Sequence, residues 1–387
     1  MIRDLRRKVR GELEAPPGLR RFGSGWMSGV LGLVLGLAGL FLVISLRVPG
    51  TFSMPEVRAL HEHAWFRLVI HALLLAAFGL SALSLALRRG KWLGTCGVTA
   101  TLVATLLGGS KATTLVADPT PLFLGLDFFV LNVLFTGLLF VPVERLFPQN
   151  AEQPLFREEW REDLFYYLVS SMLVQLLTFL TFLPAKTIVA VAPLANVRAW
   201  VGGLPFLVQF AAIMFLTDFV QYWVHRAFHR VPWLWKFHAV HHSARRMDWM
   251  AGARMHFLEI LVLRATTVLP MFVLGFSTTA ISSYIFVVYL YSTFVHANLN
   301  WRFPVMEKFL VTPRFHHWHH GIEKEAVDVN FAVHFPLLDR LFGTYHFPKD
   351  RWPADYGIGG HPVPLGYWAQ FKYPFRRNKD GETEQGS

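Results

Sequence analysis

Charged residues are scarce in this 387-residue sequence, at 16%, whereas hydrophobic residues make up 53%. A soluble globular chain carries roughly 25% charged residues. A water-exposed surface for several soluble domains cannot be built from this composition, which includes 35 Phe and 13 Trp. We therefore expect a membrane protein.

Cysteine is almost missing, since Cys96 is the one cysteine in the sequence. This excludes an internal disulfide framework, a cysteine zinc finger and a four-thiolate iron–sulfur cluster. Any bound metal is expected to have nitrogen or oxygen ligands. The net charge of +11 does not form one basic stripe, because the positive residues alternate with long apolar runs. We therefore expect no nucleic-acid partner.

Long apolar stretches are abundant, and roughly 20 such residues cross about 30 Å of hydrocarbon as a helix. The first stretch is Gly-rich and lacks a convincing small-residue cleavage site, so we interpret it as a helix and not as a signal peptide. Eight spans are predicted: Trp26–Leu46, Phe66–Leu87, Leu93–Gly109, Leu122–Val143, Leu164–Leu183, Val201–Val224, Leu258–Phe276 and Thr279–Val295.

Basic residues in the connecting segments predict the orientation. The segment before the first span is rich in Arg and Lys, and so are the segments after the second, sixth and eighth spans. The segments that alternate with them, 110–121 and 185–200, are poor in both. We expect a multi-pass protein of the bacterial inner membrane, with its N-terminus, its histidine-rich segments and its C-terminus in the cytoplasm.

Composition also predicts four regions. Residues 1–143 form an N-terminal four-span membrane extension, and 144–163 form a polar linker with a dense mixture of acidic and basic residues. Residues 164–346 contain most of the histidines and form the expected histidine-rich domain. The tail, 347–387, is rich in proline, ends in polar residues, and is expected to be irregular and partly disordered.

Histidine is the most unusual feature, because fourteen of the seventeen lie between His225 and His361. Residues 217–229 are predicted to form one helix in which His225 and His229, four residues apart, share a face. Two further clusters have i, i+3, i+4 spacing, which places three imidazoles on one side of a helical turn. They are His238, His241 and His242, and then His316, His319 and His320. His296 ends the eighth span.

Eight or nine imidazoles exceed the three or four ligands of one zinc site and fit two metals with four or five ligands each. Imidazole binds zinc, copper, iron and nickel alike, so the ligand type does not identify the metal. The isolated histidines are interpreted as ordinary surface or core residues: His61, His63, His71, His334, His346 and His361. For His256, a ligand role and a supporting role both remain open. For His317, which points off the common face, an ordinary role and a role in the site both remain open.

Asp218 lies inside an apolar span, where an acidic residue is costly and usually functional. We expect it to accept a hydrogen bond from a ligand imidazole, with a bond to a neighbouring helix as the alternative. Tyr222 lies on the same stripe of the helix.

These motifs resemble the fatty acid hydroxylase superfamily, the sterol desaturase-like integral membrane di-iron oxygenases. The resemblance covers about residues 164–345 and leaves the first four spans outside the family's core. The segments that carry it are Asp218–His229, Trp235–Ser243, His296–Asn298, Pro313–His320, Asn330 and Asp339–Tyr345.

The resemblance implies an all-α polytopic membrane bundle with a cytoplasmic helical cap that carries the histidines. It implies two iron ions, with His296 as a further ligand or close support beside eight others: His225, His229, His238, His241, His242, His316, His319 and His320. Supporting roles are expected for Asp218, Tyr222, His256, His317, Asn298 and Asn330. Some relatives carry a histidine where this chain has Asn300.

The expected activity is dioxygen-dependent hydroxylation or desaturation of a lipid C–H bond, with hydroxylation of an acyl or alkyl chain ahead of sterol desaturation. The sequence contains no haem domain, so electrons are expected from a separate electron-transfer protein. Hydrolysis is not expected, because the motif His225-Arg-Ala-Phe-His229 lacks the glutamate of zinc peptidases. The alternative is a non-enzymatic membrane metal-binding, metal-carrier or scaffold protein.

Overall fold

A computed structural model describes residues 7–8, 11–13, 15, 18, 23–115, 123–302, 304–349 and 351–376. Within these ranges the chain is helical and contains only isolated β-bridges, so the predicted all-α class is confirmed. Most of the basic residues before the first span, and residues 377–387 of the tail, lie outside the described ranges.

Eight helices in the described part are long and apolar enough to cross a membrane, which confirms the polytopic bundle. They are α2 (Trp26–Arg47), α5 (Ala64–Leu87), α6 with η3 (Trp92–Lys111), α7 (Leu126–Leu146), α9 (Val174–Val191), α11 (Phe206–Arg230), α13 (Phe257–Leu274) and α14 (Thr278–His296). The shorter helices are α3 (Pro49–Phe52), α4 (Pro55–Arg58), α8 (Trp160–Met172), α10 (Ala195–Gly202), α12 (Pro232–His242), α15 (Pro313–His319), α16 (Pro336–Phe342) and α17 (Tyr367–Lys372).

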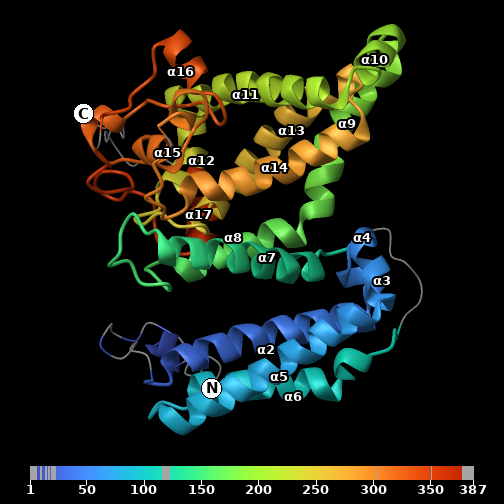
Figure 1. The fold of residues 1–387 in the computed structure, drawn as a ribbon, viewed down its shortest axis with the longest axis vertical. Helices are drawn as coiled ribbons and strands as arrows, with labels where there is room; N and C mark the ends of the chain where they lie inside the picture. Colours follow the sequence, from blue (N-terminus) through green and yellow to red (C-terminus); the bar gives the residue numbers. More distant parts are fainter. Residues whose placement is uncertain are drawn as a thin grey trace. The chain divides into compact units, whose positions relative to one another are not determined.

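The fifth and sixth spans differ from the prediction. The expected helix 164–183 is divided, because α8 ends at Met172 and the apolar helix α9 begins at Val174. The first turn of α8 carries Glu162 and Asp163, and Figure 1 shows α8 and α9 running in different directions. The sixth span begins at Phe206, after Pro205.

Residue contacts divide the chain into two compact units. Unit 1 comprises residues 1–132 and 171–175, and unit 2 comprises 133–170 and 176–387. In unit 1, α2, α5 and α6 pack against one another, as the blue helices of Figure 1 show.

Small residues allow the close packing within unit 1. A Cβ atom added to Gly32 of α2 would lie 2.7 Å from the backbone nitrogen of Ser81, in α5. One added to Gly97 of α6 would lie 3.1 Å from the backbone carbonyl carbon of Gly32. Small residues at helix interfaces are typical of membrane helices, where close backbone approach supplies the packing energy.

In unit 2, α11 packs against both α13 and α14 (Figure 1). The short helix α12 packs against α11 and α13, and α15 packs against α14. The C-terminal ends of α11 and α14 and the N-terminal end of α13 therefore meet at one end of this bundle. This end carries the histidine motifs.

Residues 144–163, for which the sequence predicts a linker, contribute buried charges to unit 2. Arg157 donates to Asp248 through Nε at 2.6 Å and through Nη2 at 2.8 Å, and it also donates to Asp163. Arg254 donates to Asp163 at 2.6 Å and to Glu159 at 2.8 Å. Buried charges persist where each has a partner, and this network ties 157–163 to the segment before α13.

The tail is more ordered than the sequence predicts, up to Arg376. Residues 367–372 form α17, and Gln370 is buried where it accepts a hydrogen bond from Tyr166 at 2.7 Å. The Gly357 backbone N–H donates to the carbonyl of His320. Aromatic and hydrogen-bonding partners therefore order this proline-rich segment without long helices.

Candidate metal centre

The structure brings nine histidines together at one end of unit 2, in two groups. In each group the potential ligand atoms lie within 4.8 Å of one another. The five-histidine group consists of His225, His229, His238, His242 and His319, and the four-histidine group consists of His241, His296, His316 and His320. All nine positions come from α11, α12, α14 and α15 or the residue after it.

Helix geometry explains this convergence. The predicted single helix through 217–229 is confirmed, since α11 continues to Arg230 and the rings of His225 and His229 lie 5.2 Å apart on one face. Both α12 and α15 begin at a proline, which has no N–H to lose in the first turn of a helix. Each then presents three imidazoles at i, i+3 and i+4.

The two groups adjoin each other. The rings of His242 and His320 stack with centroids 4.4 Å apart, and the rings of His241 and His320 lie 4.7 Å apart. Neighbouring positions on α12 thus serve different groups, because His242 belongs to the five-histidine group and His241 to the other.

Main-chain carbonyl groups orient four of the imidazoles through Nδ1. His225 bonds the carbonyl of Phe331 at 2.8 Å and His319 that of Val329 at 2.8 Å. In the four-histidine group, His241 bonds the carbonyl of Arg254 at 3.0 Å and His296 that of Ser292 at 2.6 Å. A carbonyl only accepts, so we assign the proton of these neutral rings to Nδ1 and a lone pair to Nε2.

These lone pairs face one another. The Nε2 atoms of His241 and His296 are 3.3 Å apart, and those of His225 and His238 are 3.0 Å apart. Among the described residues, Nε2 of His229 and Nε2 of His319 have no hydrogen-bond partner. Facing acceptors repel each other unless a cation lies between them, so the donor set fits bound metal ions.

Burial keeps these imidazoles neutral, as metal ligands must be. The pKa values of His238, His241 and His316 are held well below 6.5 because burial penalises the charged ring. The neighbouring imidazoles lower these pKa values further. At neutral pH the rings therefore offer lone pairs.

Glu259 is a site residue that sequence reasoning did not assign. Its carboxylate is fully buried in the first turn of α13, and Oε1 lies 2.6 Å from Nδ1 of His238. An acidic residue within a predominantly apolar span was the available signal, but the sequence does not show that this residue faces His238.

Asp218 does not have the expected contact with an imidazole. Its carboxylate accepts hydrogen bonds from the backbone N–H groups of Val333, His334 and Phe335, at 2.7 to 3.1 Å. Asp218 therefore fixes the loop that follows the carbonyl groups of residues 329 and 331. Its effect on the histidines is therefore indirect. The alternative, a bond to a neighbouring helix, is not observed either, because residues 333–335 form the loop before α16.

Tyr222 and Asn330 support the same loop. The hydroxyl of Tyr222 is hydrogen-bonded to Thr344 at 2.8 Å. Asn330, in the left-handed conformation with φ 58°, bonds the backbone of His346 through both side-chain atoms. Asparagine tolerates this conformation better than most residues, and the adjacent Val329 carbonyl orients His319.

His317 and Asn298 lie beside the four-histidine group. Burial lowers the pKa of His317 to about 3, and its Nε2 lies 3.3 Å from the carbonyl of His296 while its Nδ1 lies 2.9 Å from the Tyr356 hydroxyl. Asn298 donates its backbone N–H to Glu144 and bonds Asn150. Both residues hold the segment that follows His296.

His256 lies away from both groups. It accepts the backbone N–H of Leu258 as the N-cap of α13, and its other ring nitrogen bonds the carbonyl of Phe371 in the tail. The remaining isolated histidines also lie outside both groups.

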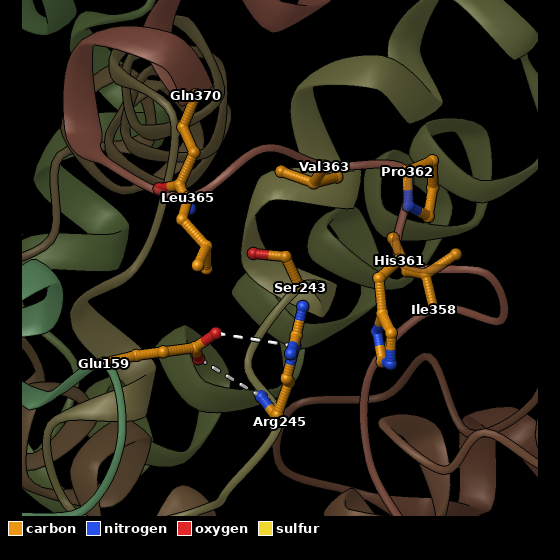
Figure 2. Close-up of a pocket in the computed structure, with 9 residues that line it drawn as sticks. All are labelled: Glu159, Ser243, Arg245, Ile358, His361, Pro362, Val363, Leu365 and Gln370. Atoms are coloured by element: carbon orange, nitrogen blue, oxygen red, sulfur yellow. Dashed lines mark hydrogen bonds and ion pairs between the residues drawn. The ribbon is translucent and has the colours of Figure 1, made fainter.

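A small cavity opens beside the buried charges (Figure 2). Its polar wall includes Glu159, Ser243 and Arg245, and its apolar wall comes from tail residues 358–365. Arg245 Nε lies 3.7 Å from Glu159 Oε1. His361, one of the isolated histidines, lines this cavity, while the nine grouped histidines are not among its described lining residues. The cavity is therefore separate from the metal-binding groups.

The fatty acid hydroxylase family model matches residues 210–344. This range contains all nine grouped histidines and Glu259. No solved structure matches the chain.

The chain is also similar to curated proteins. It is 28% identical over 237 residues to the ornithine lipid hydroxylase OlsE of Rhizobium tropici. The aligned region covers 60% of this chain and 71% of the relative. It is 30% identical over 201 residues to a protein of Dictyostelium discoideum named as a putative methylsterol monooxygenase. This region covers 50% of this chain and 70% of that relative. The human alkylglycerol monooxygenase is 27% identical over 147 residues, which are 38% of this chain and 32% of that relative. Together these matches show that the chain belongs to the fatty acid hydroxylase family.

Proposed function

We propose that this protein is an integral membrane oxidoreductase that uses dioxygen and two iron ions to hydroxylate or desaturate a C–H bond of a lipid. The observation that carries the proposal is the pair of histidine groups whose buried lone pairs converge. The relatives' names, which describe hydroxylation of ornithine lipid and monooxygenation of methylsterols and alkylglycerols, support lipid oxidation.

The five-histidine group would hold one iron and the four-histidine group the other. Zinc has no redox chemistry, so a monooxygenase needs another metal that imidazole binds, and iron satisfies this requirement. Bound iron would supply the activation of dioxygen and the removal of a hydrogen atom from the lipid. The chain itself contributes the orientation of the ligands, through carbonyl groups and Glu259, and a buried environment.

Hydroxylation places one oxygen atom in the C–H bond and releases the other as water, which consumes two electrons and two protons. We propose that a separate electron-transfer protein supplies the electrons. Formation of an alkene needs the same reductant, since both oxygen atoms then leave as water. Hydroxylation of an acyl or alkyl chain remains our preferred outcome, ahead of sterol desaturation.

Exposed apolar side chains on two of the candidate membrane helices support a lipid substrate. The outer faces of α11 and α14 expose large apolar side chains, including Phe215, Trp223 and Phe286, which suits contact with acyl chains. We propose that the lipid enters from the bilayer and that the histidines face the cytoplasm, as the basic connecting segments indicate. Residues 164–346 would supply the catalytic ligands, and residues 1–143 would form a membrane extension.

Metal content and dioxygen uptake test this function together. Detergent-purified protein is reconstituted anaerobically with Fe²⁺, then mixed with a chemical reductant and a total membrane-lipid extract. We expect about two irons per chain and lipid-dependent oxygen uptake. His241→Ala should lower the iron content and abolish the uptake.

The matched control is His361→Ala, which removes an imidazole from the cavity wall of Figure 2, away from both groups. It should retain both irons and the full rate. Wild-type protein that holds two irons and consumes no oxygen with any lipid would favour the alternative of a membrane metal-binding or scaffold protein.

A further inference from the structure

The two histidine groups differ in the partners of their imidazoles. In the four-histidine group, the Nδ1 partners that the structure shows are the main-chain carbonyl groups of Arg254 and Ser292, which carry no net charge. In the five-histidine group, two carboxylates approach Nδ1 atoms: Glu259 at His238 and Asp328 at His229. The five-histidine group therefore has carboxyl groups directly behind two of its ligands.

Glu259 makes the closer of the two contacts. Its Oε1 is 2.6 Å from Nδ1 of His238, and no solvent reaches the side chain. Its other oxygen, Oε2, has no hydrogen-bond partner within the part of the chain that the structure describes. The imidazole of His238 lies at hydrogen-bond distance from this carboxylate, which also interacts with the backbone of His256.

Asp328 contributes less. Its carboxylate is 3.4 Å from Nδ1 of His229, beyond a good hydrogen bond, and it also pairs with Arg230 at 3.2 Å. Its side chain is 27% exposed, so water weakens its interaction. Glu259 is thus the main source of the difference between the groups.

The position of His238 gives this contact its importance. Its Nε2 lies 3.0 Å from Nε2 of His225 and 3.1 Å from Nε2 of His242, so its lone pair points into the five-histidine group. A carboxylate that accepts the Nδ1 proton fixes the ring and makes the opposite nitrogen a stronger ligand.

We infer that Glu259 is a positioning residue that makes the five-histidine group the tighter of two metal positions, so that the four-histidine group loses its metal first. This inference rests on the proposed function, in which each group binds one metal. The five-histidine group also has one more imidazole than the other group, which further increases its affinity for a metal. The four-histidine position would exchange its metal while the other remains occupied.

A Co²⁺ titration tests this inference without measuring activity. Metal-free full-length protein in detergent is titrated anaerobically, and the visible absorption of bound Co²⁺ is followed in competition with a chelator. Wild-type protein should bind two Co²⁺ ions in two separated steps. His316→Ala, in the four-histidine group, should remove the weaker step and retain the tighter one.

Glu259→Gln should weaken the tighter step about 10- to 100-fold, because the amide keeps the acceptor and loses the charge. The matched control is Glu162→Gln, since Glu162 bonds Gly366 and Gln370 in the tail and not a histidine. It should leave both steps at their wild-type affinities. Glu259→Asp restores a carboxylate on a shorter side chain and should bind with intermediate affinity.

Circular dichroism and thermal unfolding of each metal-free protein identify variants that do not fold. If Glu259→Gln does not fold, Glu259→Asp replaces it, and wild-type affinity in that variant would overturn the inference. Equal affinities of the two wild-type steps, or weakening of only the weaker step in Glu259→Gln, would overturn it as well. Failure of wild-type protein to bind two metals would instead refute the proposed function.

Discussion

The two units of the chain are stabilised in different ways. In unit 1, α2, α5 and α6 approach so closely that added methyl groups at Gly32 or Gly97 would overlap with neighbouring atoms. In unit 2, buried arginines, carboxylates and imidazoles are held by specific partners. The sequence of unit 1 is therefore restricted mainly by side-chain volume, and that of unit 2 by the need to pair polar groups.

Removal of a buried charge from unit 2 should have the largest effect. Arg157→Leu leaves the carboxylates of Asp163 and Asp248 without their shared partner, which should lower the free energy of unfolding by about 3–5 kcal/mol. Hydrogen exchange should increase in residues 150–165 and 244–256, while α2 and α5 keep their protection.

The control for this comparison is Arg351→Leu, which removes one member of an exposed pair with Glu325. An exposed pair contributes about 0–1 kcal/mol, so exchange should change little. Equal destabilisation by the two arginine substitutions would show that the buried network is not what distinguishes unit 2.

A single methyl group should destabilise unit 1 by a smaller amount. Gly32→Ala places a Cβ atom 2.7 Å from the backbone nitrogen of Ser81, and such overpacking costs about 1–3 kcal/mol. Thermal unfolding in detergent should show this loss, while the Co²⁺ or iron content stays at the wild-type value. Gly79→Ala, also in a helix of unit 1, is the matched control.

No atom lies within 4 Å of the Cβ position at Gly79, so the control should unfold at the wild-type temperature or slightly above it. If Gly32→Ala and Gly79→Ala unfold at the same temperature, close packing does not limit the stability of unit 1.

The smallest predicted effect concerns pH. Burial lowers the pKa of His334 to about 4 from its model-peptide value of 6.5, so the unfolded chain binds a proton more readily across this range. Stability contributed by neutral His334 is present above pH 6.5 and is lost as the pH falls towards 4. From pH 7 to pH 6 the loss is roughly 0.5–1 kcal/mol.

His334→Gln should remove this part of the pH dependence. Burial raises the pKa of Asp339 to about 6, which makes stability decrease as the pH rises towards neutrality, but this contribution is common to both proteins. The difference between the unfolding free energies of wild type and variant therefore isolates His334. A difference that is constant from pH 5 to pH 7 would contradict the prediction.

Histidine spacing predicted much of the site, because residues at positions i, i+3 and i+4 lie on the same face of any α-helix. Nine of the eleven histidines between residues 225 and 320 were proposed as ligands from sequence, and the structure brings these nine side chains together. The eight-span bundle could be predicted from apolar length. The division between α8 and α9 could not, since the apolar residues continue across it.

Partners in distant segments were not predictable in the same way. Asp218 and Glu259 are both acidic residues in apolar spans, and sequence analysis favoured Asp218 for the contact with a histidine. The structure shows that their partners differ. Asp218 accepts hydrogen bonds from three backbone N–H groups, whereas Glu259 lies at hydrogen-bond distance from His238. Likewise, the charges of 157–163 resemble those of a solvated linker until Arg254 is placed beside them.

The bonds from imidazoles to main-chain carbonyl groups have an evolutionary consequence. Every amino acid supplies a carbonyl, so substitutions at Val329, Phe331 or Ser292 that preserve the backbone also preserve the orientation of His319, His225 or His296. Much of the ligand geometry is therefore protected against sequence drift. The partner of His238 is a side chain, so a single nucleotide change that replaces Glu259 would alter one ligand while the others stay oriented.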